Sequence, residues 1–469
     1  MLGTNTLLAE AALNSDKGVF KVGAAAIAAS PEEFPVAVDG YFNVRMFDSV
    51  VEPLFARAIM MQQGSEYFVF ATIDAVAAPP EFYAKIKKTV QEKIGLDPAR
   101  ICISATHTHF APGLRRKPYT DVNAKYIVML ADRVVQAIVT AHKNLQPAKF
   151  GWTAVREPRH VFCRRFIMKS DNVGWDEPAA FTGIKTNIAR MNPPRMSPNI
   201  VSRTGVPDQM VYVLAFQTMD GKPLAILSNY STHYAGNAKA VSSDYFGVYA
   251  RRIKEMLNAP DNFVAMMTNG TSGDTNCLDF LNAKQEPVNY LVVGEHIAEK
   301  VRDVYKNIQF SDILSTTPGL FRSRQELMTL NVRRPSESDV KEAKAFVEAN
   351  KDNPKVKITT MSYAKRTISL ESAEPTRTFP LQTVRLNDFG IATIPSEVYS
   401  FTGHDLRANS PFACACVVSL ANGSNGYLPT TEQFYLGGYN TWRGSSQLEE
   451  TAEPKIRAKL LEMMRSLDK

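Results

Sequence analysis

Short apolar runs recur along the whole chain, and most of them end at a turn residue. Runs of this length bounded by Gly, Pro, Asn or Asp predict buried strands. They lie at residues 18–25, 51–61, 67–73, 101–109, 149–155, 209–216, 224–230, 263–267, 378–386, 389–394 and 412–420. Tight turns at Gln63-Gly64 and at Gly221-Lys222-Pro223 separate two pairs of these runs and therefore predict hairpins.

Between these runs, apolar residues recur at the three- and four-residue spacing of amphipathic helices. Such segments lie at residues 80–94, 126–142, 245–257, 288–306, 336–350, 398–406 and 449–467. In the first of them Lys85, Lys87 and Lys88 are expected on the outer face, and Gly95 is a suitable C-terminal stop. The segment at 336–350 carries alternating charges, which predict a solvated surface helix.

This succession predicts an α/β fold in which mixed β-sheets are flanked by helices. No internal repeat and no linker marks a second domain, so we expect one large domain over residues 18–469, after an N-terminal extension at 1–17. Residues 176–208 are rich in Pro, Asn and Ser without periodicity, and they predict a long loop or lid.

The 469 residues are 45% apolar and 22% charged, which is typical of a globular protein with a substantial core. The net charge of +7 is small for this length and no Lys or Arg run dominates. We therefore predict no nucleic-acid binding, only a mild preference for anionic surfaces or substrates. Five cysteines form no disulfide framework. Cys414 and Cys416 are expected to face a core, with a single disulfide left open.

No stretch reaches the roughly 20 apolar residues that span a bilayer. Met1–Ala12 has an apolar patch but no positively charged region, so no signal peptide is predicted. A cytoplasmic protein and the mature form of an exported one are both consistent with this sequence.

The run at 101–109 ends in two histidines, His107 and His109, followed by Pro112-Gly113. Side chains two residues apart on a strand share a face, so both imidazoles are expected to project into one space. This arrangement suits a metal ligand beside a supporting or acid/base histidine. Two ordinary buried histidines explain the spacing equally well.

Polar residues follow three other predicted strands. His233 ends one, and the small-residue loop at 268–276 ends another; the loop either presents N–H groups to an oxyanion or is simply a tight turn. Glu397 follows a third strand, in the expected first turn of a helix capped by Ser396, where the helix dipole favours a carboxylate. A glutamate there is also a common helix starter. Two histidines with one glutamate form a known catalytic zinc set.

Adjacent arginines, Arg164 and Arg165, lie in the apolar segment 161–166. Neighbouring side chains on a strand point to opposite faces, so at most one of them would face a given site. The usual interpretation of either arginine is a surface charge.

Several of these motifs together resemble the neutral/alkaline (non-lysosomal) ceramidases. Thr106-His107-Thr108-His109 with Pro112-Gly113 is similar to that family's Thr-His-Thr-His-x-x-Pro-Gly signature. The other marks come in the family's order: the strand before His233, the Asn269 loop, Pro-x-Glu at Glu397, and Gly-Tyr at Tyr427 followed by Tyr439. The resemblance covers nearly the whole chain and implies a catalytic domain of the neutral-ceramidase type.

The resemblance also implies roles for particular residues. It implies one Zn²⁺ held by His107, His233, Glu397 and Tyr427, with His109 as the acid/base beside it. Arg164 would be the site arginine, and Arg165 is the alternative match to that position. Tyr439 would help to hold the developing oxyanion. Two residues of the glycine-rich loop, Asp274 and Asn269, are expected to bind substrate.

The implied activity is hydrolysis of an amide (N-acyl) bond by metal-activated water, as in a ceramidase, in an extracellular or periplasmic protein that touches membranes peripherally if at all. Two departures concern the substrate rather than the metal. Asp274-Thr275-Asn276 replaces the family's Ser-Pro-Asn, and the family's C-terminal immunoglobulin-like domain is not expected after the Tyr439 region. The alternative is therefore a zinc hydrolase acting on an acylated or glycosidic carbohydrate. A non-catalytic relic is less consistent with five intact site residues.

Overall fold

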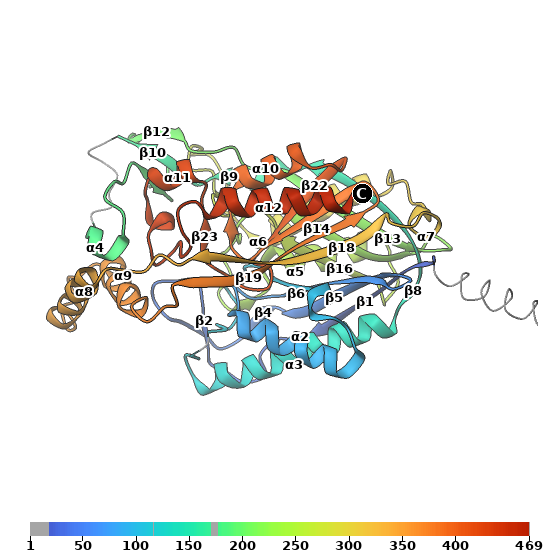
Figure 1. Ribbon diagram of the computed structural model, residues 1–469, viewed down its shortest axis with the longest axis horizontal. Helices are drawn as coiled ribbons and strands as arrows, with labels where there is room; N and C mark the ends of the chain where they lie inside the picture. Colours follow the sequence, from blue (N-terminus) through green and yellow to red (C-terminus); the bar gives the residue numbers. More distant parts are fainter. Residues whose placement is uncertain (1–17, 116, 170–176, 469) are drawn as a thin grey trace, which may run out of the picture.

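A computed structural model describes residues 18–115, 117–169 and 177–468 (Figure 1). Its centre is two β-sheets. The larger sheet has the order β16-β14-β13-β8-β1-β5-β6-β7. Its strands are β1 (Phe20–Ala28), β5 (Phe55–Gln63), β6 (Glu66–Ile73), β7 (Ile101–Ala105), β8 (Gln146–Arg156), β13 (Met210–Thr218), β14 (Pro223–Tyr230) and β16 (Val264–Asn269).

The smaller sheet has the order β18-β19-β20-β22 and packs on one face of the larger one. Its strands are β18 (Phe321–Asn331), β19 (Thr376–Leu386), β20 (Phe389–Ile394) and β22 (Cys414–Ser419). Alternate residues of both sheets fill the layer between them, for example Phe70 and Leu214 from the larger sheet and Phe389 from the smaller. Because one side-chain set of each strand enters this layer, the other set is left for helices on the outer faces.

Helices cover both outer faces, which confirms the predicted α/β class with mixed sheets flanked by helices. The outer face of the larger sheet packs against α2 (Pro80–Ile94), α3 (Asp121–Lys143), α5 (Asp244–Met256) and α6 (Tyr290–Tyr305). The smaller sheet packs against α10 (Ser400–Asn409) and α12 (Ala452–Leu467). Among the described residues, none of the helices combines the length and apolarity needed to cross a membrane.

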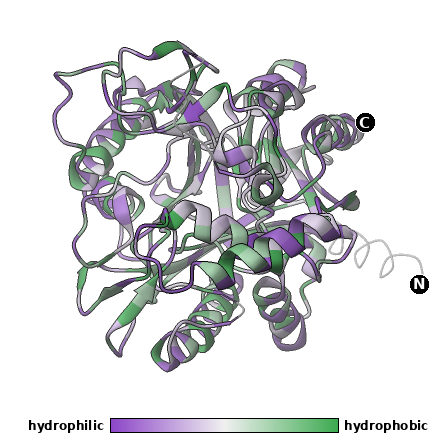
Figure 2. Cartoon of the chain, turned by 90° about the vertical axis from the view of Figure 1, so that its left-hand side faces the viewer, coloured by the Kyte–Doolittle hydropathy of each residue, from purple (hydrophilic) through white to green (hydrophobic). Residues whose placement is uncertain are grey.

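Shorter elements gather at one end of the two sheets (left in Figure 1). They include the helices α4 (Ala179–Thr182), α8 (Glu337–Ala349), α9 (Ile358–Ser369) and α11 (Thr431–Tyr435) and the small sheets formed by β2 (Val36–Val38), β3 (Arg45–Phe47), β9 (Phe162–Cys163), β10 (Arg165–Met168), β11 (Ala189–Met191), β12 (Ile200–Arg203), β17 (Thr275–Asn276), β21 (Glu397–Val398) and β23 (Tyr427–Leu428). Two further strands and one further α-helix are β4 (Val50–Glu52), β15 (Val241–Ser242) and α7 (Ile313–Thr316). Figure 2 views this end and shows hydrophilic and hydrophobic segments interspersed.

Parallel strand pairs bring several carboxyl ends of strands to this same end. β7 runs parallel to β6, β16 to β14, and β22 to β20. Asn422 joins the sheets, because its N–H donates to the Ile103 carbonyl at 2.8 Å and its Oδ1 accepts the Ile103 N–H at 3.1 Å. The segments that follow β7, β14, β16, β20 and β22 are therefore held together, as expected for a site at strand ends.

Four sequence predictions need correction. Lys87 is buried against the sheet, whereas Lys85 and Lys88 are exposed as expected. The helix expected at 398–406 begins only at Ser400, so Glu397 lies in strand β21 and not in a first helical turn. Residues 177–208 contain α4, β11 and β12 instead of a structureless lid, and Asp176 lies outside the described residues. Arg164 and Arg165 are both buried, so neither is a surface charge.

The expected surface helix at 336–350 is confirmed as α8, which begins with a capping box between Ser336 and Asp339. α8 packs against a second helix, α9, which the sequence pattern does not predict. All five cysteines are free and buried, as expected for Cys414 and Cys416, so the single disulfide left open by the sequence does not form.

Candidate metal and active site

His107 occupies a turn, not the strand expected for it. β7 ends at Ala105, and His107 has φ 74°, a left-handed conformation that is rare for a residue with a Cβ. Its N–H donates to the Ala75 carbonyl at 2.9 Å, and its Nδ1 lies 2.8 Å from the Val76 carbonyl oxygen. A carbonyl oxygen only accepts, so Nδ1 carries the proton and the lone pair is on Nε2. The strained turn thus aims an unprotonated nitrogen inward.

His107, His109 and His233 form a cluster of three buried imidazoles. The Nε2 atom of His107 lies 3.2 Å from Nε2 of His233 and 3.4 Å from Nε2 of His109. One ligand atom from each of the three residues lies within 4.8 Å of the other two, as in a metal site. The ring of His109 stacks on Tyr234 with a centroid separation of 3.9 Å, so its orientation is fixed by packing.

Glu397 and Tyr427 reach the cluster from the other sheet. They are paired on the parallel strands β21 and β23, which follow β20 and β22 in the chain and form a separate two-stranded sheet. The Oε2 atom of Glu397 lies 3.5 Å from Nε2 of His107 and has no hydrogen-bond partner among the described residues. A largely buried carboxylate oxygen without a donor is costly unless a cation binds it. The ring of Tyr427 meets that of Tyr439 edge to face at 6.0 Å.

The arginine pair divides as its spacing predicts, and the structure distinguishes its two members. Arg164 lines the cavity and donates from Nη2 to the Gly273 carbonyl at 3.0 Å and to the Tyr427 hydroxyl at 3.3 Å. Arg165 points away and binds Asn440 and Gln433 at 2.9 and 3.0 Å. Arg164 is therefore the member that faces the site, and Arg165 holds the α11 segment in place.

The electrostatics of the site keep the imidazoles of His109 and His233 neutral and the Glu397 carboxylate ionised. Burial is the main cause that holds the pKa of His109 and of His233 well below the usual value, and Arg164 lowers both further. Burial alone would raise the pKa of Glu397, but His107 and Arg164 outweigh it and the pKa is lowered. Burial raises the pKa of Tyr427 well above its usual range. Neutral imidazole and ionised carboxylate are the forms that bind a metal.

A cavity of about 380 Å³ opens over this cluster. All seven residues expected to be ligands or catalytic groups line it: His107, His109, Arg164, His233, Glu397, Tyr427 and Tyr439. A larger hollow of about 900 Å³ lies elsewhere, around Lys21 and Arg322, and contains none of the predicted residues. The structure thus brings the seven together although they span 333 positions of the chain, from 107 to 439, counted inclusively.

The two residues expected to bind substrate, Asn269 and Asp274, lie beneath the cavity and do not line it. The Asn269 amide donates to the carbonyls of Thr106 at 3.3 Å and Thr232 at 3.5 Å, the residues just before His107 and His233. The loop N–H groups from Gly270 to Gly273 all donate to acceptors within the protein. The loop is therefore a tight turn and does not present these N–H groups to an oxyanion. This geometry favours a positioning role for Asn269.

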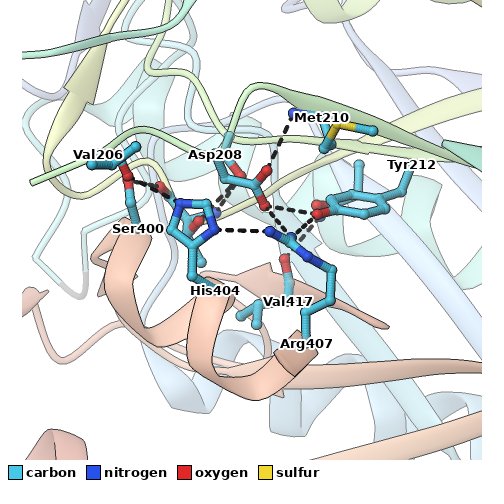
Figure 3. A network of polar contacts seen from close by, with 11 residues as sticks. Val206, Asp208, Met210, Tyr212, Ser400, His404, Arg407 and Val417 are labelled. Carbon is cyan, nitrogen blue, oxygen red and sulfur yellow. Dashed lines mark hydrogen bonds and ion pairs between the residues drawn. The ribbon is translucent and has the colours of Figure 1, made fainter. Parts of the chain in front are cut away.

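Asp274 joins two parts of the site through its backbone and its carboxylate. Its carbonyl accepts the Arg164 N–H at 3.0 Å, and its Oδ1 accepts the Ser400 N–H and hydroxyl, each at 2.8 Å. Ser400 begins α10, three residues after Glu397. The second half of α10 is tied down where Arg407 binds Asp208 at 2.9 Å and His404 Nε2 lies 3.1 Å from the Val206 carbonyl oxygen (Figure 3). The segment that carries Glu397 is therefore anchored at both ends of the following helix.

Comparison with solved structures places this arrangement in a known fold. Neutral ceramidase from Pseudomonas aeruginosa matches with a TM-score of 0.68 and 16% identity, over 96% of this chain and 75% of the other. A ceramidase complexed with C2 matches with a TM-score of 0.69 and 15% identity, over 96% of this chain and 75% of that one. The chain has the neutral ceramidase fold. No protein-family model matches it.

The ceramidase fold confirms the resemblance seen in the sequence. The sequence does not identify several residues of the cavity wall. They are Gly40, Tyr41 and Phe42 after β2, Tyr234 after His233, and Tyr363 and Arg366 in α9. Tyr234 adjoins a predicted ligand and could have been found. The others carry no motif, because the fold alone brings them to the cavity.

Proposed function

We propose that this protein is a zinc-dependent hydrolase of amide bonds, related in mechanism to the ceramidases whose fold it shares. The observation that carries the proposal is the convergence of three imidazoles and an unpartnered carboxylate oxygen in one buried cluster. Nitrogen and carboxylate oxygen are donors that Zn²⁺ prefers. Without a cation, the cluster would cost free energy, because the Glu397 Oε2 atom is buried without a hydrogen-bond partner among the described residues.

In this proposal His107, His233, Glu397 and Tyr427 hold the metal. When bound, zinc would lower the pKa of water from about 15.7 towards about 7 and polarise the substrate carbonyl. His109 is the other residue able to bind it, since three histidines are also a catalytic zinc set. We assign His109 to proton transfer instead, because the carboxylate of Glu397, whose Oε2 lies 3.5 Å from Nε2 of His107, already supplies a third strong ligand.

The remaining groups act on protons and charge. Hydrolysis adds water across the C–N bond, with oxygen to the acyl carbon and a proton to the leaving amine. His109, neutral because of its burial, accepts the proton of the attacking water at Nε2 and returns it to the amine nitrogen. Arg164 and Tyr439 line the same cavity and stabilise the negative charge that develops on the carbonyl oxygen; one such donor is commonly worth about 3 kcal/mol.

Metal analysis and chelation test this proposal. Purified protein should contain about one zinc per chain, as in a single catalytic site, and a chelator should abolish hydrolysis until zinc is restored. His107→Ala should lose the metal, whereas His109→Ala should retain it and lose turnover. His142→Ala, which changes a histidine of α3 outside the cavity, is the control. Wild-type protein that is metal-free after purification and binds no added zinc contradicts the scheme, and loss of zinc from His109→Ala moves that residue into the ligand set.

The substrate alternative remains an acylated or glycosidic carbohydrate, and the polar lining of the cavity favours it over a long-chain lipid. A panel of N-acylsphingosine, acetylated sugars, p-nitrophenyl glycosides and p-nitrophenyl esters, each assayed with and without chelator, separates amide, ester and glycosidic activities. Cleavage of N-acylsphingosine alone would identify a ceramidase in the strict sense.

A further inference from the structure

The wall of the active-site cavity is aromatic and cationic beyond the proposed metal ligands. Three arginines line it, Arg115, Arg164 and Arg366, whereas its only acidic lining residue among the described ones is Glu397. Val76 is its only aliphatic lining side chain within the same part of the chain. Long alkyl chains are bound by apolar walls, since their burial supplies the binding free energy. This wall is suited instead to a compact, polar and negatively charged molecule.

The three arginines differ in what already binds them. Arg115 forms an ion pair with Asp39 at 2.6 Å. Arg164 is buried and engaged with Gly273 and Tyr427. No carboxylate of the described residues lies within ion-pair distance of Arg366. Only its Nη1 atom is hydrogen-bonded, to the Ser445 hydroxyl at 3.3 Å and the Gly444 carbonyl at 3.4 Å. Its Nη2 and Nε atoms are therefore available to an anion.

The position of Arg366 is fixed before any ligand arrives. Its guanidinium lies 4.9 Å from the ring centre of Tyr363 and 5.8 Å from that of Phe42. A Cβ at Gly444 would come within 2.7 Å of the Arg366 Cδ atom, so this glycine provides the space in which the side chain lies. Contacts of this kind hold the planar group in one orientation and reduce the entropy lost on binding.

Arg366 is also coupled to the reacting end of the cavity. Its partner Ser445 accepts the Tyr427 N–H through the backbone carbonyl at 2.9 Å, and the Tyr363 hydroxyl lies 2.5 Å from the Ser445 hydroxyl. α9, which carries Tyr363 and Arg366, packs through Tyr363 and Ala364 on Trp442. An anion on Arg366 would thus lie in the same chamber as the scissile bond and not at a remote surface.

We infer that this site takes a compact amide whose amine part bears a free carboxylate, an N-acyl amino acid, with Arg366 binding that carboxylate. The inference rests on the proposed amide hydrolysis and specifies its substrate class. A guanidinium donates two parallel N–H groups to a carboxylate, which is the geometry that the free Nη2 and Nε edge offers. Arg366 is accordingly a specificity-determining residue.

A pair of substrates that differ only in charge tests the inference. For the zinc-loaded wild-type protein, kcat/KM for N-butyrylalanine should exceed that for N-butyrylalaninamide at least tenfold and should exceed that for a long-chain N-acylsphingosine. In Arg366→Gln the KM for N-butyrylalanine should rise about tenfold or more, while its kcat and both constants for the neutral amide stay within about twofold. Arg366→Lys should recover part of the loss.

Lys365→Gln is the matched control, since it removes one positive charge from the neighbouring, exposed position of α9. It should behave as wild type, which separates a local contact from a general effect of net charge. Calorimetric titration of His109→Ala with N-butyrylalanine, alone and combined with Arg366→Gln, measures binding without turnover. The double variant should bind about tenfold more weakly.

The possible failures are distinguishable. If N-acylsphingosine is cleaved and the charged and neutral amides are equivalent, the inference is wrong and amide hydrolysis stands. If no amide is cleaved in the presence of zinc, the proposed function fails, and the titration alone decides about the carboxylate site. Equal binding with and without Arg366 overturns the inference in that case as well.

Discussion

Glu397 and Tyr427 are direct neighbours on two parallel strands of only two residues each, although 30 positions separate them in the sequence. The Glu397 N–H donates to the Gly426 carbonyl at 2.9 Å. The two strands follow β20 and β22, which are also parallel and whose last partners are Ile394 and Ser419, but they form a separate two-stranded sheet. The pairing of these two short strands thus sets the spacing between a carboxylate and a phenol at the proposed metal site.

We expect these two ligands to contribute unequally to zinc affinity. Glu397 is ionised, whereas burial raises the pKa of Tyr427, so its phenol is neutral until a cation binds. Glu397→Gln should therefore weaken zinc binding at least tenfold and more than Tyr427→Phe does. Competition with a chromophoric chelator measures both constants. The reverse order would show that the phenol is the stronger ligand and that this electrostatic argument is wrong.

Gly40 leaves the space that His109 occupies. A Cβ on Gly40 would lie 2.1 Å from the His109 Nδ1 atom, and Gly40 has φ 95°, which disfavours any side chain. Gly40→Ala should displace the imidazole and lower kcat at least tenfold while the zinc content stays at the wild-type level.

Gly95→Ala is the control for the backbone cost alone. Gly95 has φ 73° at the end of α2, and a Cβ there would meet nothing within 4 Å. Both variants should lose about 1 kcal/mol of stability from the left-handed conformation, but only Gly40→Ala should lose activity. Equal activity of the two would remove the basis for assigning His109 a fixed catalytic position.

Much of the strand and helix pattern could be predicted because it depends on local periodicity. The strands β1, β5 and β6 and the helices α2 and α3 occupy the expected segments, and the hairpin turn lies at Gly64. The left-handed turn at His107 could not be predicted, since nothing in Thr-His-Thr-His signals a positive φ in a residue other than glycine. Glu397 was assigned to a helix because Ser396 is a good cap, but the long-range pairing with Tyr427 prevails over that local preference.

The site residues divide in the same way. His107, His109, His233 and Glu397 are found by their place after strands, and Arg164 follows from the family resemblance. No sequence motif marks Arg366 or Phe42 as a site residue. They reach the cavity because α9 and the loop between β2 and β3 pack beside it. Asn269 was expected to bind substrate, yet full burial gives its amide only protein partners.

Asn269 should act on zinc affinity through the two histidine segments that it joins. Asn269→Leu removes the donor shared by the Thr106 and Thr232 carbonyls, and loss of such buried hydrogen bonds costs about 1–3 kcal/mol. We expect zinc affinity to fall about tenfold, a size typical of residues that orient ligands. Urea unfolding and chelator competition measure the two effects separately.

Asn229→Leu is the matched control. Asn229 is equally buried and binds Thr268 at 3.0 Å and the Val417 carbonyl at 2.9 Å, farther from the histidines. It should lose similar stability and retain wild-type zinc affinity. If both variants lose the same affinity, Asn269 contributes only to general stability.

Lys87 gives a pH-dependent prediction that is independent of the site. It is buried in α2 near Cys102, and burial lowers its pKa from 10.5 to about 8. Above about pH 10.5 the lysine is neutral in both the folded and the unfolded chain and costs nothing. As the pH falls towards 8 the unfolded chain gains the proton first, so stability is lost over this window, and below about pH 8 the full cost remains.

Lys87→Met should therefore stabilise the protein at pH 7 by on the order of 1–3 kcal/mol, and the gain should shrink as the pH rises to 10. Urea unfolding of wild type and variant at the two pH values measures the difference. Lys88→Met, at the exposed neighbouring position, should change stability by less than about 0.5 kcal/mol at either pH, since only a surface pair with Glu92 is lost. A gain from Lys87→Met that is the same at pH 7 and pH 10 would come from packing and not from the buried charge.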